Sequence, residues 1–134
     1  MKKYLHLVAK VIFSLILSLP IVGALGVFPE PARDLYNTDQ AFAFIKMLMY
    51  VAYINYMMSV VHIIALVALW TKREALASLL VLPMALYVVA FHLVIDGGLF
   101  TAGAALGNLM LLINFYLMWK NCEVIKSLAK PQVA

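Results

Sequence analysis

The chain has 134 residues, of which 66% are hydrophobic and only 12% are charged, and its mean hydropathy is +1.02. These values lie outside the range of a water-soluble domain of this length, so we expect one integral membrane domain over residues 1–134. The net charge is +4, but the ten Lys and Arg residues flank apolar segments and form no patch, which argues against a nucleic-acid partner.

Residues 5–28 form the first predicted membrane helix, because this apolar run can cross about 30 Å of hydrocarbon. The run also resembles a signal peptide, but it contains no good small-residue cleavage site before its polar break, which favours a retained helix. Polar residues recur at every fourth position and form a stripe that we expect to face protein. The stripe comprises His6, Lys10, Ser14 and Ser18.

Residues 28–40 contain two prolines and predict the largest exposed loop, with Thr38 or Asp39 capping the next helix. Residues 41–70 form the second predicted helix. This segment is longer than an upright span requires, so we expect it to tilt or to project beyond the bilayer.

Polar residues lie on both faces of the second predicted helix. Asn55, Ser59 and His62 share one face, and for Asn55 and Ser59 we expect hydrogen bonds between helices. Lys46 lies on the opposite face near the helix start, where its ammonium group can reach the membrane surface.

A tight turn at residues 71–74 leads into the third predicted helix, residues 75–96, which should be antiparallel to the second. His92 and Asp96 are four residues apart and therefore share a face of this helix. A titratable pair in a membrane helix is a candidate functional site. The alternative is that Asp96 simply ends the helix before two glycines.

The fourth predicted helix covers residues 99–119, and its glycines Gly103 and Gly107 have the spacing of a helix-packing motif. The last segment, residues 120–134, predicts a short amphipathic tail at the membrane interface. The glycine face can pack within one chain or between two copies, and both alternatives stay open.

The fold class expected from these elements is an all-α, integral membrane four-helix bundle with up-down-up-down connections. Eight of the ten basic residues lie on the side of the termini, so the positive-inside rule places both termini in the cytoplasm. We expect a multi-pass protein of the bacterial inner membrane.

Counting at about 1.5 Å per residue sorts the polar side chains into three layers. If they point inward, they form either a hydrogen-bonded core or the lining of a small cavity. The outer layer holds Lys46, His92, Asp96 and Asp39, the middle layer holds Ser18, Asn55, Tyr87 and Asn108, and the cytoplasmic layer holds Lys10, Ser14, His62 and Asn114.

Cofactor and catalytic motifs are sparse in this sequence. His62 and His92 should differ in height by about 15 Å, which argues against a haem held by both. No set of His, Cys and carboxylate residues has the spacing of metal ligands, and no nucleophile or phosphate-loop motif occurs. The single cysteine, Cys122, excludes an intrachain disulfide.

The order of features from residue 28 to residue 121 resembles the DoxX-like family of small four-helix membrane proteins. The most specific part is the segment LASLLVLPMALYVVAFHLVIDGG, which contains Pro83, the pair Phe91-His92 and then Asp96. The chain has His62 in the second helix, where such proteins often carry a glutamate, and IVGALGVFPEP in place of the family's usual end of the first helix. The resemblance implies the four-helix fold, and some members look like membrane subunits of sulfur-compound:quinone oxidoreductases.

Three functions follow from these observations. The leading hypothesis is a non-enzymatic accessory or scaffold subunit that binds a protein partner or a second copy of itself. The alternative is a subunit of a quinone-linked oxidoreductase, in which His92 and Asp96 handle protons at a quinone, the one cofactor we consider. The third is a binder or carrier of a small hydrophobic ligand, with the polar axis as its cavity.

Overall fold

The computed structural model describes residues 2–128 and residue 130, and residues 1, 129 and 131–134, which include the end of the expected tail, lie outside the described part. Every regular element in that part is helical, which confirms the all-α prediction. In chain order the elements are α1 (Lys2–Ala24), η1 (Arg33–Leu35), α2 (Asp39–Tyr50), α3 (Ala52–Trp70), α4 (Glu74–Val94), α5 (Ala104–Lys120) and α6 (Cys122–Leu128).

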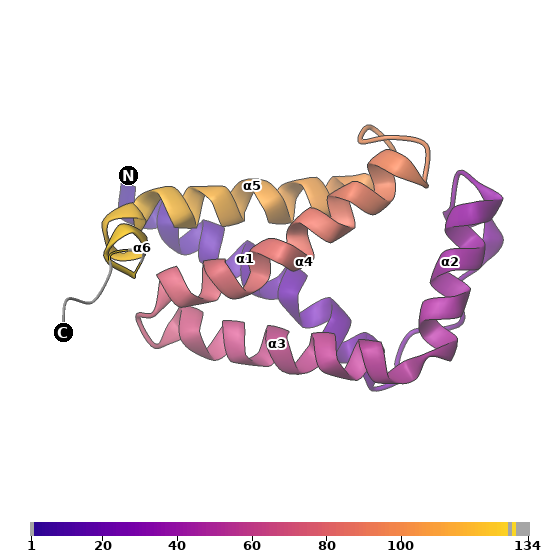
Figure 1. Cartoon of the computed structure of the whole chain (residues 1–134), viewed down its shortest axis with the longest axis horizontal. Helices are drawn as coiled ribbons and strands as arrows, with labels where there is room; N and C mark the ends of the chain where they lie inside the picture. The colour runs from indigo at the N-terminus through magenta and orange to yellow at the C-terminus, as the bar shows by residue number, and fades with distance from the viewer. Residues whose placement is uncertain (1, 129, 131–134) are drawn as a thin grey trace.

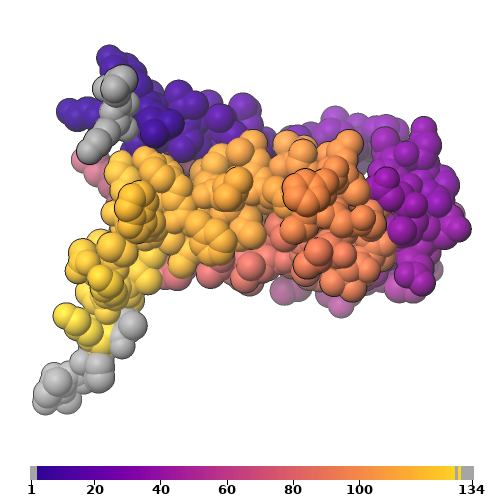
Figure 2. Space-filling view, turned by 90° about the horizontal axis from the view of Figure 1, so that it is seen from above, coloured from indigo at the N-terminus to yellow at the C-terminus, as the bar shows by residue number. Residues whose placement is uncertain are grey.

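Helices α1, α3, α4 and α5 pack side by side along the long axis of the molecule (Figure 1). Helix α4 packs against α3 and α5, and α1 packs against the same two helices. The apolar core between them includes Phe13, Leu17, Leu69, Val81 and Leu117. Helix α2 covers one end of this group, and α6 projects from the other end (Figure 2).

Three helical stretches are long and apolar enough to cross a membrane: Lys3–Ala24, Ala52–Trp70 and Glu74–Val94. Large apolar side chains such as Leu5, Leu15 and Leu112 also cover the outside of the molecule. A water-soluble protein rarely exposes so much contiguous apolar surface. Both observations indicate a membrane protein.

The predicted helix over residues 41–70 is wrong in one respect, because the structure divides it into α2 and α3. Val51 has φ −89° and ψ 63°, outside the helical region, and it separates the two helices. Helix α2 turns across the end of the bundle, where the Phe44 ring stacks on Phe91 with centroids 5.6 Å apart. Valine is a weak helix former, so a break at this position costs little local stability. The contact between Phe44 and Phe91 then favours the bent arrangement.

Two loops also differ from the expected boundaries. Helix α1 ends at Ala24, and α5 begins at Ala104, so the connections before α2 and after α4 are longer than expected. Gly97 and Gly98 have φ values of 90° and 121°, which glycine adopts without strain. The Thr38 hydroxyl accepts the Ala41 N–H at 3.0 Å, which confirms the predicted cap of α2.

Gly107 determines how closely α4 and α5 approach each other. A Cβ atom added at this position would lie 2.7 Å from Val88 Cγ1, which is too close for packed carbon atoms. Replacing Gly107 by leucine should therefore push the helices apart and cost about 1 to 3 kcal/mol of stability. We expect Gly107→Leu to lower the midpoint of thermal unfolding in detergent. Ala105→Leu, at an exposed position of the same helix, is the control, and equal midpoints for both variants would contradict this packing.

Candidate functional site

The buried pair His92 and Asp96 lies at the end of α4 that faces α2. The His92 Nδ1–H donates a hydrogen bond to Asp96 Oδ2 at 2.8 Å. Only 1% of Asp96 and 9% of His92 is exposed, so an ionised Asp96 is a buried charge. Such a group must be hydrogen-bonded to be tolerated.

The other carboxylate oxygen of Asp96 holds the loop that precedes α2. The backbone N–H of Asn37 donates to Asp96 Oδ1 at 2.9 Å. Next to it, the Thr38 hydroxyl donates to the Ile95 carbonyl at 2.6 Å. Asp96 therefore has two roles. One oxygen accepts a hydrogen bond from His92 in the polar pair, and the other accepts from Asn37 near the end of α4.

Gly103, directly before α5, and Gly107, within α5, make room for this pair. A Cβ atom at Gly103 would lie 3.1 Å from His92 Cε1 and 3.7 Å from Asp96 Oδ2. A Cβ atom at Gly107 would lie 3.9 Å from His92 Cδ2. The His92 imidazole thus lies against the glycine face of α5, and a larger residue at Gly103 would displace it.

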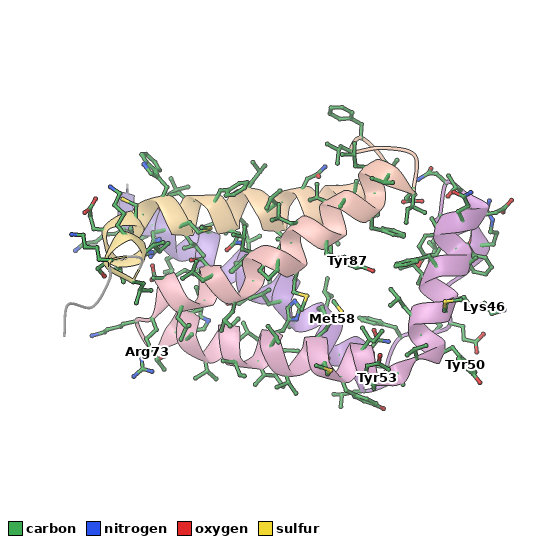
Figure 3. The ribbon with its side chains drawn as sticks, in the orientation of Figure 1. Lys46, Tyr50, Tyr53, Met58, Arg73 and Tyr87 are labelled. Atoms are coloured by element: carbon green, nitrogen blue, oxygen red, sulfur yellow. The ribbon has the colours of Figure 1, made fainter. Side chains whose placement is uncertain are left out.

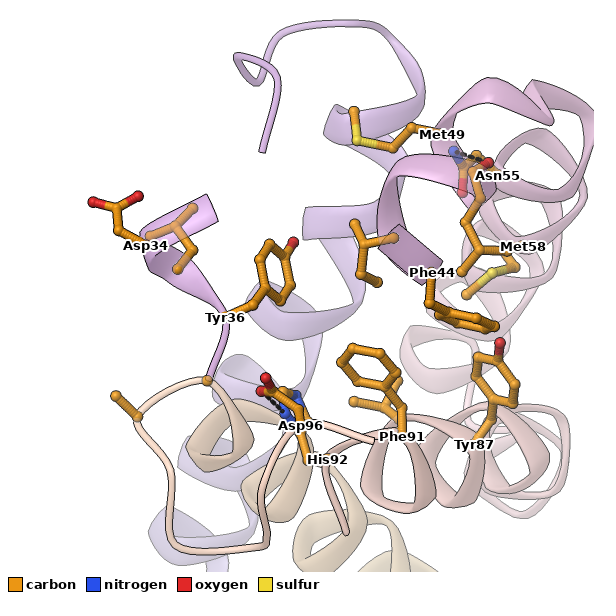
Figure 4. A pocket seen from close by; sticks show the side chains of 16 residues that line it. Asp34, Tyr36, Phe44, Met49, Asn55, Met58, Tyr87, Phe91, His92 and Asp96 are labelled. Carbon is orange, nitrogen blue, oxygen red and sulfur yellow. Dashed lines mark hydrogen bonds and ion pairs between the residues drawn. The ribbon is translucent and has the colours of Figure 1, made fainter. Parts of the chain in front are cut away.

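A cavity of about 620 Å³ lies between α2, the end of α4 and the loop that contains η1 (Figure 4). Four aromatic residues line it, and His92 and Asp96 lie at its edge. The Phe44 ring is 5.6 Å from Phe91 and 6.4 Å from Tyr87, measured between ring centroids. A largely apolar cavity of this size with a few polar groups is typical of a small-molecule site.

A second cavity of about 490 Å³ continues from the first toward the end of α1. It is lined by apolar residues such as Leu19, Pro20 and Phe28. The two cavities share six lining residues, so they lie next to each other. The shared residues are Leu35, Tyr36, Ile45, Met49, Asn55 and Met58.

Tyr36 offers the cavity a hydrogen-bond donor. Burial raises the pKa of its phenol, and the negative charge of Asp96 raises the pKa further. Tyr36 therefore keeps its proton at least up to the ordinary tyrosine pKa of about 10. Its hydroxyl points into the cavity in Figure 4, and it bonds to no other group in the described part of the chain.

Lys46 and Asp39 lie apart from the pair His92 and Asp96, with which they share the predicted outer layer. Lys46 is exposed on the side of α2 that faces away from Tyr87 and Met58 (Figure 3). Asp39 accepts a hydrogen bond from Arg33 at 2.6 Å on the surface. The cause is the break at Val51, because residues before it no longer continue the faces of α3.

The remaining polar residues predicted from the sequence do not form one continuous axis. Asn55 and Tyr87 line the first cavity. Asn108 donates to the carbonyl of residue 99, and His62 donates through Nδ1 to the carbonyl of residue 58. The Asn114 side chain is fully buried and has no hydrogen-bond partner among the described residues.

A second polar network at the opposite end of the bundle was missed in the sequence. Glu74 Oε1 accepts hydrogen bonds from Lys10 Nζ and His6 Nε2, both at 3.0 Å. Trp70 donates to Ser14 at 2.9 Å, and Lys10 lies 4.8 Å from the Trp70 ring. The polar stripe of α1 predicts a surface that faces protein, but the sequence pattern assigns Glu74 only to a turn. Lys10 and Glu74 both lie near the cytoplasmic end of the predicted bundle, and this shared depth is the signal that predicts their contact.

No protein-family model, curated protein or solved structure matches this chain. Its function is therefore inferred from the cavity and from the residues that line it.

The hydrogen bond from Asn37 to Asp96 predicts how tightly the loop before α2 is held. A hydrogen bond to a charged group contributes about 1.5 to 3 kcal/mol. Asp96→Ala should therefore increase hydrogen exchange of residues 36–41 by about ten- to a hundredfold, while α3 exchanges as before. Mass spectrometry of peptides after deuterium labelling measures this change. Asp39→Ala, at an exposed ion pair, is the control, and unchanged exchange in Asp96→Ala would contradict the role of Asp96.

Proposed function

We propose that this protein is a multi-pass membrane protein that binds a small lipophilic ligand in the cavity under α2. The observation that supports this most directly is the aromatic cavity of about 620 Å³ next to the buried pair His92 and Asp96. Four rings offer apolar contact, and the Tyr36 hydroxyl and the His92 imidazole can hydrogen-bond to polar atoms of a ligand.

The membrane topology that accompanies this function has four spans, α1, α3, α4 and α5, with up-down-up-down connections and both termini in the cytoplasm. Helix α5 has 17 residues and packs along α4. Helix α2 has 12 residues, or about 18 Å, which is too short to cross a bilayer. It therefore lies across the outer surface, and the cavity opens at that level. The proposed membrane is the inner membrane of a bacterium.

The single cysteine makes this topology testable. In intact bacterial cells, a membrane-impermeant maleimide should leave Cys122 unlabelled and should label it once the membrane is permeabilised. In a Cys122→Ala background, Asp34→Cys should be labelled in intact cells, because Asp34 is exposed in the outer loop. The opposite labelling pattern would contradict the orientation.

A quinone is the second candidate ligand, suggested by the resemblance to the DoxX-like family. The cavity residues fit a head group of this kind, because Tyr36 can donate to a carbonyl oxygen and Phe44 and Phe91 can contact a flat ring. The observation that favours it is the pair His92 and Asp96, which could hold a proton beside that oxygen. When bound, the quinone would supply the redox chemistry.

The accessory-subunit role stays a prediction from the sequence, and it is compatible with a bound ligand. A stoichiometric protein partner that co-purifies in mild detergent would support it. A chain that consistently purifies alone would count against it.

Photolabelling tests ligand binding at the proposed place. A fatty alcohol that carries a diazirine on its chain should label residues of α2 and α4 around the cavity when the protein is in lipid nanodiscs. Leu48→Trp should reduce this labelling at least several-fold, because Leu48 lines the cavity and the indole would fill it. Met47→Trp is the matched control, since Met47 is exposed and lines neither cavity.

Labelling spread evenly over lipid-facing positions such as Val60 and Leu112 would contradict the proposed site, because both side chains are exposed on the bundle. An equal effect of the two tryptophan variants would contradict it as well.

A further inference from the structure

The charged groups that line the two cavities are acidic, apart from the pairing imidazole of His92. Asp96 and Asp34 line the first cavity, and Glu30 borders the second. Among the described residues, no lysine or arginine lines either cavity. The electrostatic potential inside should therefore be negative.

The nearest basic side chains do not offset this charge fully. Arg33 donates to Asp39 and to the carbonyl of residue 36, both at 2.6 Å. Lys46 borders a separate groove that also contains Glu30, so it can offset only that carboxylate. Within the described chain, Asp34 and Asp96 form no ion pair with a lysine or an arginine.

The aromatic walls favour the same sign of charge in a ligand. Tyr36, Phe44, Tyr87 and Phe91 line the first cavity. The face of each ring carries partial negative charge and attracts ammonium groups, and several rings together form the usual recognition site for quaternary ammonium groups. The carboxylates and the aromatic rings thus both favour a positively charged ligand.

From these two observations we infer that the cavity binds a lipophilic cation, meaning an amine or quaternary ammonium group with an apolar tail. This inference rests on the ligand-binding function proposed above and names its substrate class. Asp96 is 1% exposed, so its charge acts through space and not through direct contact. In a low-dielectric site that attraction is stronger than in water.

The presence or absence of a second proton on the His92 imidazole determines how strongly the cavity distinguishes a cation from an anion. With a neutral imidazole, the pair of His92 and Asp96 carries one negative charge, which attracts a cation and repels an anion. With a protonated imidazole, the pair is neutral, and Asp34 and the ring faces still favour a cation. In both states an anionic amphiphile is disfavoured.

The apolar tail fits the second cavity. This space continues from Tyr36 and Ile45 along Leu19 and Pro20 at the end of α1. A head group in the first cavity, beside its aromatic rings, would therefore direct its tail away from Asp96 and toward the end of α1. A single-chain amphiphile has this shape.

Three photoactivatable amphiphiles test the inference. They share one diazirine-bearing alkyl chain and differ only in the head group, which is trimethylammonium, hydroxyl or sulfonate. Each is titrated against the full chain in phosphatidylcholine nanodiscs, and empty nanodiscs correct for partitioning. We expect half-maximal labelling of the cavity by the ammonium probe at a concentration about tenfold lower than by the alcohol. The sulfonate should label the cavity least.

The outcomes separate this inference from the function on which it rests. Equal labelling by the alcohol and the ammonium probe would overturn the cation preference and leave the ligand site intact. Stronger labelling by the sulfonate would overturn it as well. If none of the probes labels the cavity, both the inference and the proposed function are overturned.

A matched pair of variants tests the role of the aromatic walls. Phe44→Leu keeps an apolar side chain but removes an aromatic ring that lines the cavity. It should raise the concentration of the ammonium probe needed for half-maximal labelling by about two- to thirtyfold, and change that of the alcohol probe by no more than about twofold. Phe100→Leu, at an exposed residue outside both cavities, should change neither. Because the alcohol probe also reports folding, an equal loss for both probes in Phe44→Leu would contradict the cation–ring contact.

Discussion

The buried carboxylate of Asp96 is the group on which the end of the molecule that carries α2 depends. Burying an unpaired carboxylate costs several kcal/mol, so both of its oxygens must find donors. One oxygen accepts from His92 within α4, and the other accepts from the backbone of Asn37. The second bond fixes the loop before α2, and the position of α2 in turn encloses the cavity. The hydrogen bonds that one buried carboxylate requires thus lead to a largely apolar cavity.

The same end shows why the cavity requires a broken helix. If residues 41–70 were one straight helix, Phe44 would extend beyond α3 and could not reach Phe91. With the break at Val51, α2 folds over the bundle and Phe44 stacks on Phe91. The space between them is lined on one side by α2 and on the other by Tyr87 and its neighbours. The cavity therefore depends on the bend at Val51.

The sequence predicted features that depend on local spacing. The four-residue interval places His92 and Asp96 on one face, and the predicted cap, Thr38 or Asp39, includes the residue that caps α2. Features that depend on distant partners were missed. No glycine or proline marks the break at Val51, so local propensity alone gave a continuous helix. The partner of Asp96 in the loop is a backbone N–H, which every residue carries and no sequence motif reveals.

The two ends of the bundle differ in how they are held together. At the end where α1 begins, Glu74 accepts hydrogen bonds from two residues of α1, and Asn121 Nδ2 lies 3.4 Å from its other oxygen. At the opposite end, α2 is tied down by single bonds from Asn37 and Thr38. These unequal contacts leave α2 and its loop as the part of the molecule that can move with the fewest broken bonds. For the proposed ligand and topology, any change on binding would therefore be expressed at one surface of the membrane only.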